Sequence, residues 1–253
     1  SQRSQNAHWV YLLFTMPKKE TVWLNVQLPT TEEQLALDEV LLDQSHTGHF
    51  QGVMVRAWMP TEPAVILGSS SCLEEEVDSQ ACKDTGTRIL RRPSGGATVV
   101  IGPGCLMWSV VTHHPLTTPG IKEIHSSILD PLSRALSKRS RHPVIRRGLS
   151  DLAIHASEGE RKVSGNSLRV RKHSVLYHGT LLDTFDISLI SRVLRHPPRE
   201  PDYRKHRSHQ AFLSNLDIGR GTLIDALQEA FEVDHMATKF PRHKVSQLVK
   251  NRY

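Results

Sequence analysis

The stretch from residue 88 to residue 111, RILRRPSGGATVVIGPGCLMWSVV, constrains the fold more than any other part of the chain. Two arginines precede a Ser-Gly-Gly turn, and an apolar run rich in β-branched residues, typical of a strand, follows it. Small side chains in such a loop let backbone N–H groups approach an anion closely, while Arg91 or Arg92 neutralises its charge. The composition suits a phosphate, but an isolated Ser-Gly-Gly is also typical of an ordinary hairpin turn.

Three further motifs follow in chain order. They are Gly148-Leu149-Ser150-Asp151-Leu152, then Lys162-Val163-Ser164-Gly165-Asn166, then Tyr177-His178-Gly179-Thr180-Leu181-Leu182. With the loop at Arg91, these stretches resemble the lipoate-protein ligase A family of the biotin and lipoate protein ligase superfamily. The family motifs are Arg-Arg-x-Ser-Gly-Gly-Gly, Gly-x-x-Asp-Leu, Lys-x-Ser-Gly and His-Gly-Thr-Leu-Leu. The looser resemblance extends from about Leu24 to the C-terminus.

The resemblance implies a single α/β (α+β) domain, with a mixed, mostly antiparallel central sheet flanked by helices. We expect residues 1–19 to form an N-terminal extension and residues 20–253 to form the catalytic domain. We expect the family's C-terminal accessory domain to be absent. Periodicity and turn residues predict the elements within the domain. Helices are expected from Thr31 and over 74–84, 120–138, 186–195 and 221–232, and strands over 53–58 and 64–68 (a hairpin), 99–101, 106–111, 146–154, around 162 and over 174–183.

The resemblance also implies the site residues. Lys162 corresponds to the family's essential lysine, and its ammonium would lie between a carboxylate and the α-phosphate of ATP, two anions that must meet. Asp151 would lie beside it and bind Mg²⁺, which prefers oxygen ligands. Trp58 would face the acyl pocket and His178 would position the acyl chain or the ribose. The full set of candidate substrate- or nucleotide-binding residues is Trp58, Arg91, Arg92, Ser94, Gly95, Gly96, Ala97, Val99, Ser150, Asp151, Ser164, Gly165, His178, Gly179 and Thr180.

Each of these residues also has an ordinary structural interpretation. Lys162 lies in a polar, turn-like segment, where most lysines are merely exposed. Asp151 could cap a turn, while Trp58 and His178 could simply fill the core. The sequence also departs from the family pattern. Ala97 replaces the third glycine of the loop, at a position where positive φ or a close approach would favour glycine. Ile101 and Tyr177 replace residues that are often histidine in the family, and Ser150 replaces one that is often asparagine.

The three cysteines separate two neighbouring chemistries. Octanoyltransferases of the superfamily pass an acyl group through a cysteine thioester, and their nucleophile lies just before the Asp-Leu stretch or well after the His-Gly strand. Neither place holds a cysteine here, because Arg146 lies near the first and Cys105 is the last cysteine of the chain. The sequence alone still leaves Cys72 and Cys105 free to approach the pocket in three dimensions. An odd number of cysteines does not predict a disulfide framework and favours a reducing, cytoplasmic location.

Charge and hydropathy limit the partners. The formal net charge is +6, which favours an acidic partner. The basic clusters lack interleaved aromatic residues, so we do not expect nucleic acid to be the partner. No apolar run approaches the roughly 20 residues of a membrane-spanning helix.

These features predict an enzyme that attaches lipoate, or a related acyl group, to the acceptor lysine of a lipoyl carrier domain through an acyl adenylate. ATP, Mg²⁺ and lipoate or lipoyl-AMP are the expected cofactors and substrates. The expected acceptors are the carrier domains of 2-oxoacid dehydrogenases or the glycine cleavage H protein, with a separate accessory protein as a further candidate partner. Two alternatives stay open: an acyltransferase that uses an acyl-protein donor without ATP, and a non-catalytic descendant that binds a carrier or nucleic acid.

Overall fold

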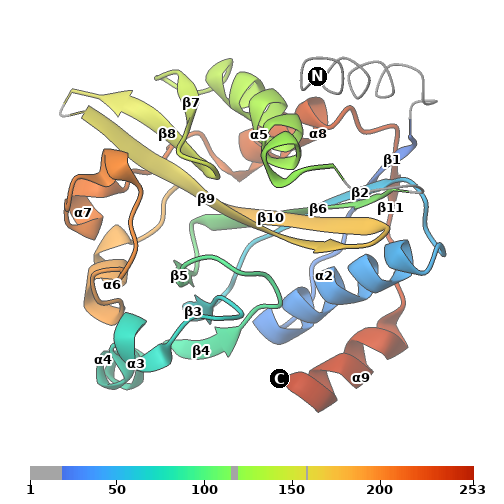
Figure 1. Cartoon of the computed structure of the whole chain (residues 1–253), viewed down its shortest axis with the longest axis horizontal. Coiled ribbons are helices and arrows are strands. Elements are labelled where there is room, and N and C mark those ends of the chain that lie inside the picture. The colour runs from blue at the N-terminus through green and yellow to red at the C-terminus, as the bar shows by residue number, and fades with distance from the viewer. Residues whose placement is uncertain (1–18, 115–118, 158) are drawn as a thin grey trace, which may run out of the picture.

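The computed structural model describes residues 19–114, 119–157 and 159–253. The expected N-terminal extension therefore lies, apart from Lys19, outside the described residues. The 253-residue chain folds around a large sheet that crosses the whole molecule (Figure 1).

The large sheet has eight strands among the described residues. Its parallel pairs, β11 with β1 and β1 with β2, lie at one edge, and every other neighbouring pair is antiparallel. The expected mixed, mostly antiparallel sheet is confirmed. In spatial order the strands are β11 (His235–Ala237), β1 (Thr21–Leu24), β2 (Val53–Trp58), β6 (Cys105–His113), β10 (Ser174–Leu182), β9 (Gly159–Arg171), β8 (Asp151–Ala156) and β7 (Val144–Arg147).

A second, three-stranded sheet carries the loop that follows the two arginines. It consists of β4 (Arg88–Arg91), β3 (Ala64–Leu67) and β5 (Val99–Ile101). The predicted hairpin of 53–58 with 64–68 is wrong, because β2 and β3 belong to different sheets. Two prolines in the connection lack N–H donors, and the Gln27 side chain bonds both the N–H and the carbonyl of Met59. The chain therefore leaves the first sheet at Met59 instead of turning back along β2.

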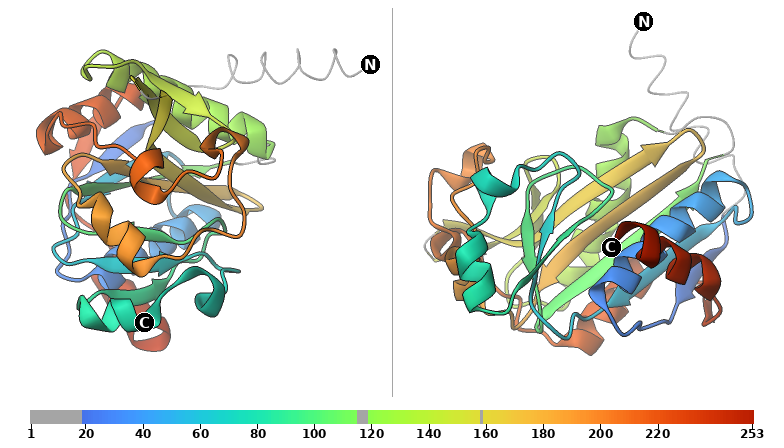
Figure 2. Two further views of the ribbon diagram at one scale, coloured as in Figure 1. Left: turned by 90° about the vertical axis from the view of Figure 1, so that its left-hand side faces the viewer. Right: turned by 90° about the horizontal axis from the view of Figure 1, so that it is seen from below.

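Two pairs of helices cover the faces of the large sheet (Figures 1 and 2). Helices α2 (Thr31–His46) and α9 (Arg242–Arg252) pack on one face, and α5 (Ile121–Ser137) and α8 (Arg220–Ala230) on the other. Helix α2 begins with a capping box, in which Thr30 accepts a bond from the Glu33 N–H and the Glu33 carboxylate accepts one from the Thr30 N–H. These helices bury two separate apolar clusters against the sheet.

Short helices surround the small sheet at one end of the molecule (Figure 2). The predicted helix over 74–84 is two helices, because Val77 is extended (φ −125°) and forms a bridge with Leu194. The predictions for 120–138, 186–195 and 221–232 are confirmed within a few residues, whereas α7, β1, β11 and α9 were not predicted. The short elements are α3 (Leu73–Glu76), α4 (Ser79–Asp84), α6 (Ile187–Val193), the 3₁₀ helix η1 (Asp202–Arg204) and α7 (His209–Phe212).

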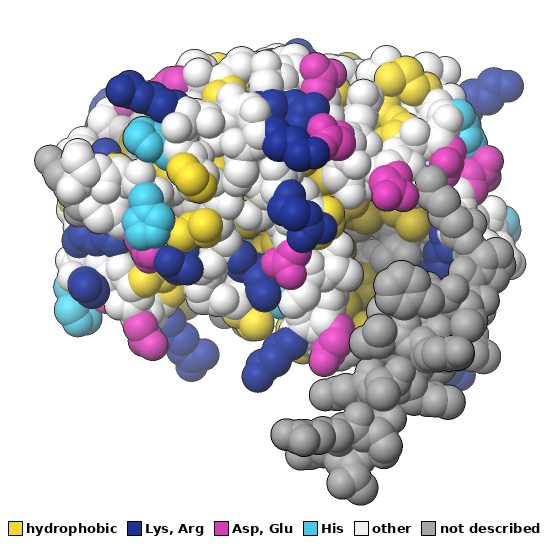
Figure 3. Space-filling model, turned by 90° about the horizontal axis from the view of Figure 1, so that it is seen from above, with side chains coloured by type: hydrophobic (Ala, Val, Ile, Leu, Met, Phe, Trp, Pro, Cys, Tyr) yellow, Lys and Arg dark blue, Asp and Glu magenta, His cyan; other side chains and the backbone are white. Residues whose placement is uncertain are grey.

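The face above α5, β7 and α8 mixes both signs of charge (Figure 3). Glu229 pairs with Lys138 and Arg139, and Asp130 pairs with Arg146. This pairing favours the interpretation of these basic clusters as solvated surface rather than as a binding site for a polyanion. Within the described ranges, no helix combines the length and apolarity needed to cross a bilayer.

Candidate active site

A cavity of about 700 Å³ lies between the small sheet, the large sheet and the segment from residue 195 to residue 213. Its volume falls within the range of about 300–1,000 Å³ that is usual for small-molecule sites. All four motifs of the sequence meet there, although they lie far apart along the chain. They contribute Arg92, Gly96, Ala97 and Val99, then Ser150 and Asp151, then Lys162, Ser164 and Gly165, and finally His178, Gly179 and Thr180.

The Lys162 ammonium and the Asp151 carboxylate form an ion pair in the cavity wall, with Nζ 2.8 Å from Oδ1. A β-bulge between β8 and β9 makes the pair possible. Leu152 pairs with Ser164, but Ala153 pairs with Lys162, so Val163 is the extra residue. In an uninterrupted ladder Lys162 would pair with Ile154 and point to the opposite face. The bulge brings it to the face of Asp151. The strand expected around residue 162 is confirmed, whereas the turn that its polar neighbours had suggested is not found there.

Tyr203 forms a hydrogen bond with the second oxygen of the Asp151 carboxylate. Its hydroxyl donates to Asp151 Oδ2 at 2.9 Å. Burial, followed by the adjacent Asp151 charge, raises the pKa of Tyr203, so the hydroxyl stays a donor at neutral pH. Gly165 leaves room for the lysine, because a Cβ at this position would lie 3.0 Å from Lys162 Cε and Nζ. Tyr203, Asp151 and Lys162 thus form one hydrogen-bonded row in the cavity wall.

Asn166 connects the second and third motifs. Its side-chain N–H₂ donates to the Ser150 carbonyl at 2.8 Å and to Ser164 Oγ at 3.0 Å. The position opposite must be glycine, because a Cβ on Gly179 would lie 1.7 Å from Asn166 Oδ1. Asn166 therefore fixes the chain just before Asp151, and the glycine of the His-Gly-Thr motif accommodates it.

We expect the substitution Gly179→Ala to lower the free energy of unfolding by about 1–3 kcal/mol, because the new methyl group forces Asn166 out of its place. Thermal or denaturant unfolding measures the change. The matched control is Gly221→Ala in α8, where nothing lies within 4 Å of the new Cβ. That helical position should gain up to about 1 kcal/mol. Equal stability of the Gly179→Ala variant and the parent protein would show that Asn166 does not need this space.

Arg92 lies beneath the Ser-Gly-Gly loop and holds its shape. It is 6% exposed. Its guanidinium donates to Ser94 Oγ and to the carbonyls of Ile66, Gly95 and Ala97, at 2.6 to 3.0 Å. Burial lowers the pKa of Arg92 to about 10, with the Glu76 charge opposing the shift, so the group still carries its charge at neutral pH. Arg92 therefore shapes the loop and places a positive charge under it.

Ala97 fits the loop without backbone strain. The residue with positive φ is Gly96 (φ 86°), and Ala97 is absent from the non-glycine residues with positive φ. The third loop position therefore needs no left-handed conformation here, and the strain considered from the sequence does not arise at Ala97. The end of the loop is also fixed in place, because the Glu76 carboxylate accepts hydrogen bonds from the Thr98 N–H and hydroxyl at 3.1 and 2.6 Å.

His178 faces the cavity from β10 and is held by two side chains. Its Nε2 lies 2.5 Å from Ser94 Oγ, and its Nδ1 lies 3.8 Å from Asp38 Oδ2. Burial raises the pKa of Asp38, but Arg56 and then His178 together lower it further, so the net shift is downward and the carboxylate is ionised. Asp38 also contacts Arg56 Nη1 at 2.7 Å. This buried network orients the imidazole toward the cavity.

Four expected site residues do not line the cavity. Trp58 is buried in the apolar cluster that also contains Leu35 and Met107, two residues of the wall, so it supports that wall from behind. Ser94 does not reach the cavity, but its hydroxyl contacts the His178 ring, which does. Arg91 is the last residue of β4 and donates to the Gly68 and Ser71 carbonyls, whereas Arg92 lies beneath the loop. Gly95 contributes its carbonyl to Arg92.

Several lining residues were not predicted. Glu76 and Arg195 were assigned only to predicted helices, and no role was predicted for Arg199 or Tyr203. Tyr203 could have been found only through its contact with Asp151, which depends on tertiary structure. The apolar part of the wall includes Leu35, Ile66, Met107, Leu182, Ile190, Leu194, Phe212 and Leu213.

None of the three cysteines lines the cavity. Cys105 is fully buried, and burial raises its pKa to about 12. Burial, and then the nearby Asp78 charge, raises the pKa of Cys82 as well. Cys72 is exposed and its thiol contacts Glu74 at 3.3 Å. The structure therefore places no cysteine in this cavity that could act as a thiolate nucleophile.

Comparison with known proteins identifies the family of this chain. Residues 30–234 match the model of a protein family described as the lipoyl protein ligase A/B catalytic domain. Octanoyltransferase LipM from Carboxydothermus hydrogenoformans is 27% identical over 87% of this chain and 91% of that protein. Proteins from Aeropyrum pernix and Schizosaccharomyces pombe, both provisionally named lipoate-protein ligase A, are 29% and 24% identical over 63% and 87% of this chain. The matches span only 56% and 57% of those two proteins.

Solved structures share the fold. A bi-partite lipoate protein ligase from Thermoplasma acidophilum, described with its E2 lipoyl domain, superposes with a TM-score of 0.75 at 23% identity, covering 92% of this chain and 93% of that chain. A lipoate-protein ligase A bound with ATP gives a TM-score of 0.74 at 23% identity, covering 91% and 94%. The arrangement of sheets and helices described above is therefore that of the ligase catalytic domain.

Proposed function

Because this chain belongs to the lipoyl protein ligase A/B catalytic-domain family, we propose that it attaches lipoate, or a related medium-chain acyl group, to the acceptor lysine of a lipoyl carrier domain through an acyl adenylate. One observation carries the proposal. A glycine-containing loop over a buried arginine, a lysine–aspartate pair and an apolar wall line one cavity, and no cysteine does. The three parts suit an acyl adenylate, which combines a phosphate, a reactive carbonyl and an apolar tail.

The proposed reaction has two steps. In the first, a carboxylate oxygen of the acid attacks the α-phosphorus of ATP, and the bond to pyrophosphate breaks. In the second, the acceptor amine attacks the acyl carbon, AMP leaves with the electron pair of the acyl C–O bond, and the amine loses a proton. Lys162 stabilises negative charge in both steps, because its ammonium lies where the carboxylate and phosphate oxygens must meet. Asp151 positions that ammonium, and neither step needs Lys162 to transfer a proton.

The remaining parts of the cavity have supporting roles in this proposal. Backbone N–H groups of the loop at Gly96 and Ala97 would face the phosphate, with the Arg92 charge beneath them. The apolar wall would hold the acyl tail and exclude water from it. His178, whose two ring nitrogens face Ser94 and Asp38, would pack against the substrate and position it.

Mg²⁺ fits this site as a companion of ATP. Asp151 presents one oxygen to Lys162 and one to Tyr203, and each oxygen keeps a free lone pair. Magnesium held mainly by phosphates needs only one or two protein carboxylates, and it would neutralise phosphate charge there. Among the described residues, no cluster of three His, Cys, Asp or Glu ligands includes Asp151, so the phosphates would supply most of the ligands of Mg²⁺.

The second candidate is transfer from an acyl-protein donor without ATP, which the likeness to an octanoyltransferase favours. That chemistry, as known in the superfamily, uses a cysteine thioester, and the three cysteines lie outside the cavity. We therefore favour the adenylate route. Lipoyl carrier domains are the proposed acceptors, as in the Thermoplasma acidophilum system, and three free cysteines suit a reducing, cytoplasmic compartment.

Intact-mass spectrometry of a carrier domain tests the proposal. The domain is incubated with the chain and with one of three donors: lipoate plus Mg-ATP, lipoyl-AMP, or an octanoylated carrier protein. We expect modification in the first two incubations and none in the third. Modification from lipoyl-AMP alone would assign adenylate formation to a separate partner protein. Modification only from the acyl carrier protein would contradict the adenylate route.

Cysteine variants provide the second arm of this test. Replacing Cys72, Cys82 or Cys105 singly by alanine should change the transfer rate by less than about twofold, roughly 0.4 kcal/mol in the barrier. The mass of the protein itself should show no acylated thiol during turnover. A single replacement that abolishes transfer, together with an acyl adduct on that cysteine in the parent protein, would establish the thioester mechanism instead.

A further inference from the structure

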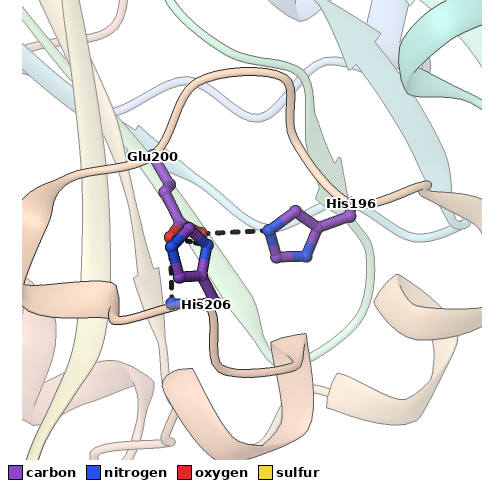
Figure 4. Close-up of side chains that lie close together, drawn as sticks. All are labelled: His196, Glu200 and His206. Carbon is purple, nitrogen blue, oxygen red and sulfur yellow. Dashed lines mark hydrogen bonds and ion pairs between the residues drawn. The ribbon is translucent and has the colours of Figure 1, made fainter.

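Three potential metal ligands meet on the segment that forms one wall of the cavity (Figure 4). His196 Nε2 lies 3.0 Å from Glu200 Oε2, and His206 Nδ1 lies 2.8 Å from Glu200 Oε1. All three ligand atoms lie within 4.8 Å of one another. The carboxylate is 15% exposed, whereas the two imidazoles are 50% and 89% exposed and open to solvent.

The backbone is bent to bring these groups together. Lys205 and His206 both have positive φ, 52° and 56°, which is uncommon for residues other than glycine. The bend returns the chain to Glu200, whose Oε1 accepts the His206 N–H at 2.9 Å. His206 therefore presents both its backbone N–H and its ring to one carboxylate, and His196 reaches the same carboxylate from the other end of the segment.

An arginine also contacts the Glu200 carboxylate. Arg204 Nε lies 3.4 Å from Glu200 Oε2 and adds positive charge. This arginine opposes a bound cation and weakens its binding. Its guanidinium also stacks on Phe212, 5.0 Å from the ring centroid.

We propose that His196, Glu200 and His206 bind one divalent transition metal of the zinc class and thereby clamp the segment between residues 196 and 206. Two imidazoles and a carboxylate form a ligand set that zinc uses in proteins, with a fourth position left for water. Ligand atoms on one tetrahedral zinc with bonds of about 2.0–2.1 Å lie about 3.3 Å apart. The separations of 2.8 and 3.0 Å join the two imidazoles to different oxygens of Glu200, and the three ligand atoms lie within 4.8 Å of one another, so rotations of the exposed imidazoles would bring them to that spacing.

The clamp would act on the cavity because the same segment lines it. Pro197, Arg199, Pro201 and Tyr203 all face the cavity, and Tyr203 donates to Asp151. A metal joining residues 196, 200 and 206 would restrict this wall without contacting Lys162 or Asp151. The inference goes beyond the acyl-transfer proposal and stands on different side chains, so either can fail without the other.

Calorimetric titration of ZnCl₂ into the full chain tests the binding. The protein is prepared without a histidine tag and freed of metal by a chelating resin. We expect one zinc per chain, and we expect His196→Ala and His206→Ala each to weaken binding by at least about tenfold, or about 1.4 kcal/mol. His243→Ala, an exposed histidine on α9, is the matched control and should bind as the parent does. No binding, or binding that survives both substitutions, would overturn the site.

Hydrogen–deuterium exchange tests the clamp separately. With ZnCl₂ present, amides of residues 197–207 should exchange at least about tenfold more slowly than in the metal-free protein. Glu200→Gln keeps an oxygen acceptor for the His206 N–H but removes the charged ligand, so this variant should show no zinc-dependent protection. Unchanged exchange in the parent protein at saturating zinc would overturn the proposed clamp even if zinc binds.

Discussion

Replacing Lys162 by alanine should slow acyl transfer from lipoyl-AMP by about 10²–10³-fold, because the substitution removes the ammonium beside the developing negative charge. The step after adenylate formation is the informative one, since it contains no ATP or pyrophosphate chemistry. Single-turnover transfer to a carrier domain, followed by intact-mass spectrometry, measures the rate. Lys172→Ala, which removes an exposed lysine at the turn between β9 and β10, is the matched control and should leave the rate unchanged.

The Lys162→Ala variant should stay folded but lose some stability. Its side chain is 24% exposed and pairs with a carboxylate that is 10% exposed. Asp151 would keep the Tyr203 hydroxyl and lose its cation, which costs about 1–3 kcal/mol. Thermal unfolding of both lysine variants separates this loss from the loss of rate. Transfer at the parental rate by a folded Lys162→Ala protein would remove this lysine from the mechanism.

The sequence predicted which segments form the site because each motif is local. The Ser-Gly-Gly loop, the Asp-Leu strand, the Lys-x-Ser-Gly stretch and the His-Gly-Thr strand are all short, and all four line one cavity. The sheet class followed from the same resemblance. Helices α2 and α5 were found where they were expected.

The structural features that the sequence did not predict depend on pairing between residues that lie far apart in the chain. The orientation of Lys162 comes from a bulge that inserts Val163, and no local pattern distinguishes that bulge from a polar turn. The strands β2 and β3 look like a hairpin because they are close in sequence, but their partners β6 and β5 lie further along the chain. Tyr203 enters the site through a segment whose composition suggests only a basic surface.

The two arginines show the same limit at the level of single side chains. Composition assigned positive charge to the loop but could not choose between Arg91 and Arg92. The structure separates them, because Arg92 is buried beneath the loop while Arg91 turns outward. Arg92 uses four acceptors, so its planar fork matters as much as its charge.

We therefore expect Arg92→Lys to slow transfer by about 100-fold, about 2.7 kcal/mol in the barrier, although the charge is kept. A lysine can donate from one nitrogen only, and it cannot reach the Ile66, Gly95 and Ala97 carbonyls together. The loop would lose its shape, and its N–H groups would no longer face the phosphate. We also expect the free energy of unfolding to fall by about 3 kcal/mol, because charge-assisted hydrogen bonds in a buried place are lost.

Arg91→Lys is the matched substitution one residue earlier, and it should alter the rate by less than about threefold, roughly 0.65 kcal/mol. Rates for both variants come from transfer of a lipoyl group from lipoyl-AMP, with denaturant unfolding as the measure of stability. If Arg92→Lys kept the parental rate and Arg92→Ala lost it, charge alone would suffice and the fork would be dispensable. If Arg91→Lys were the damaging change, the anion would be neutralised by the outward arginine. The pattern we expect, a large effect at Arg92 and a small one at Arg91, follows from which of the two guanidinium groups lies under the loop.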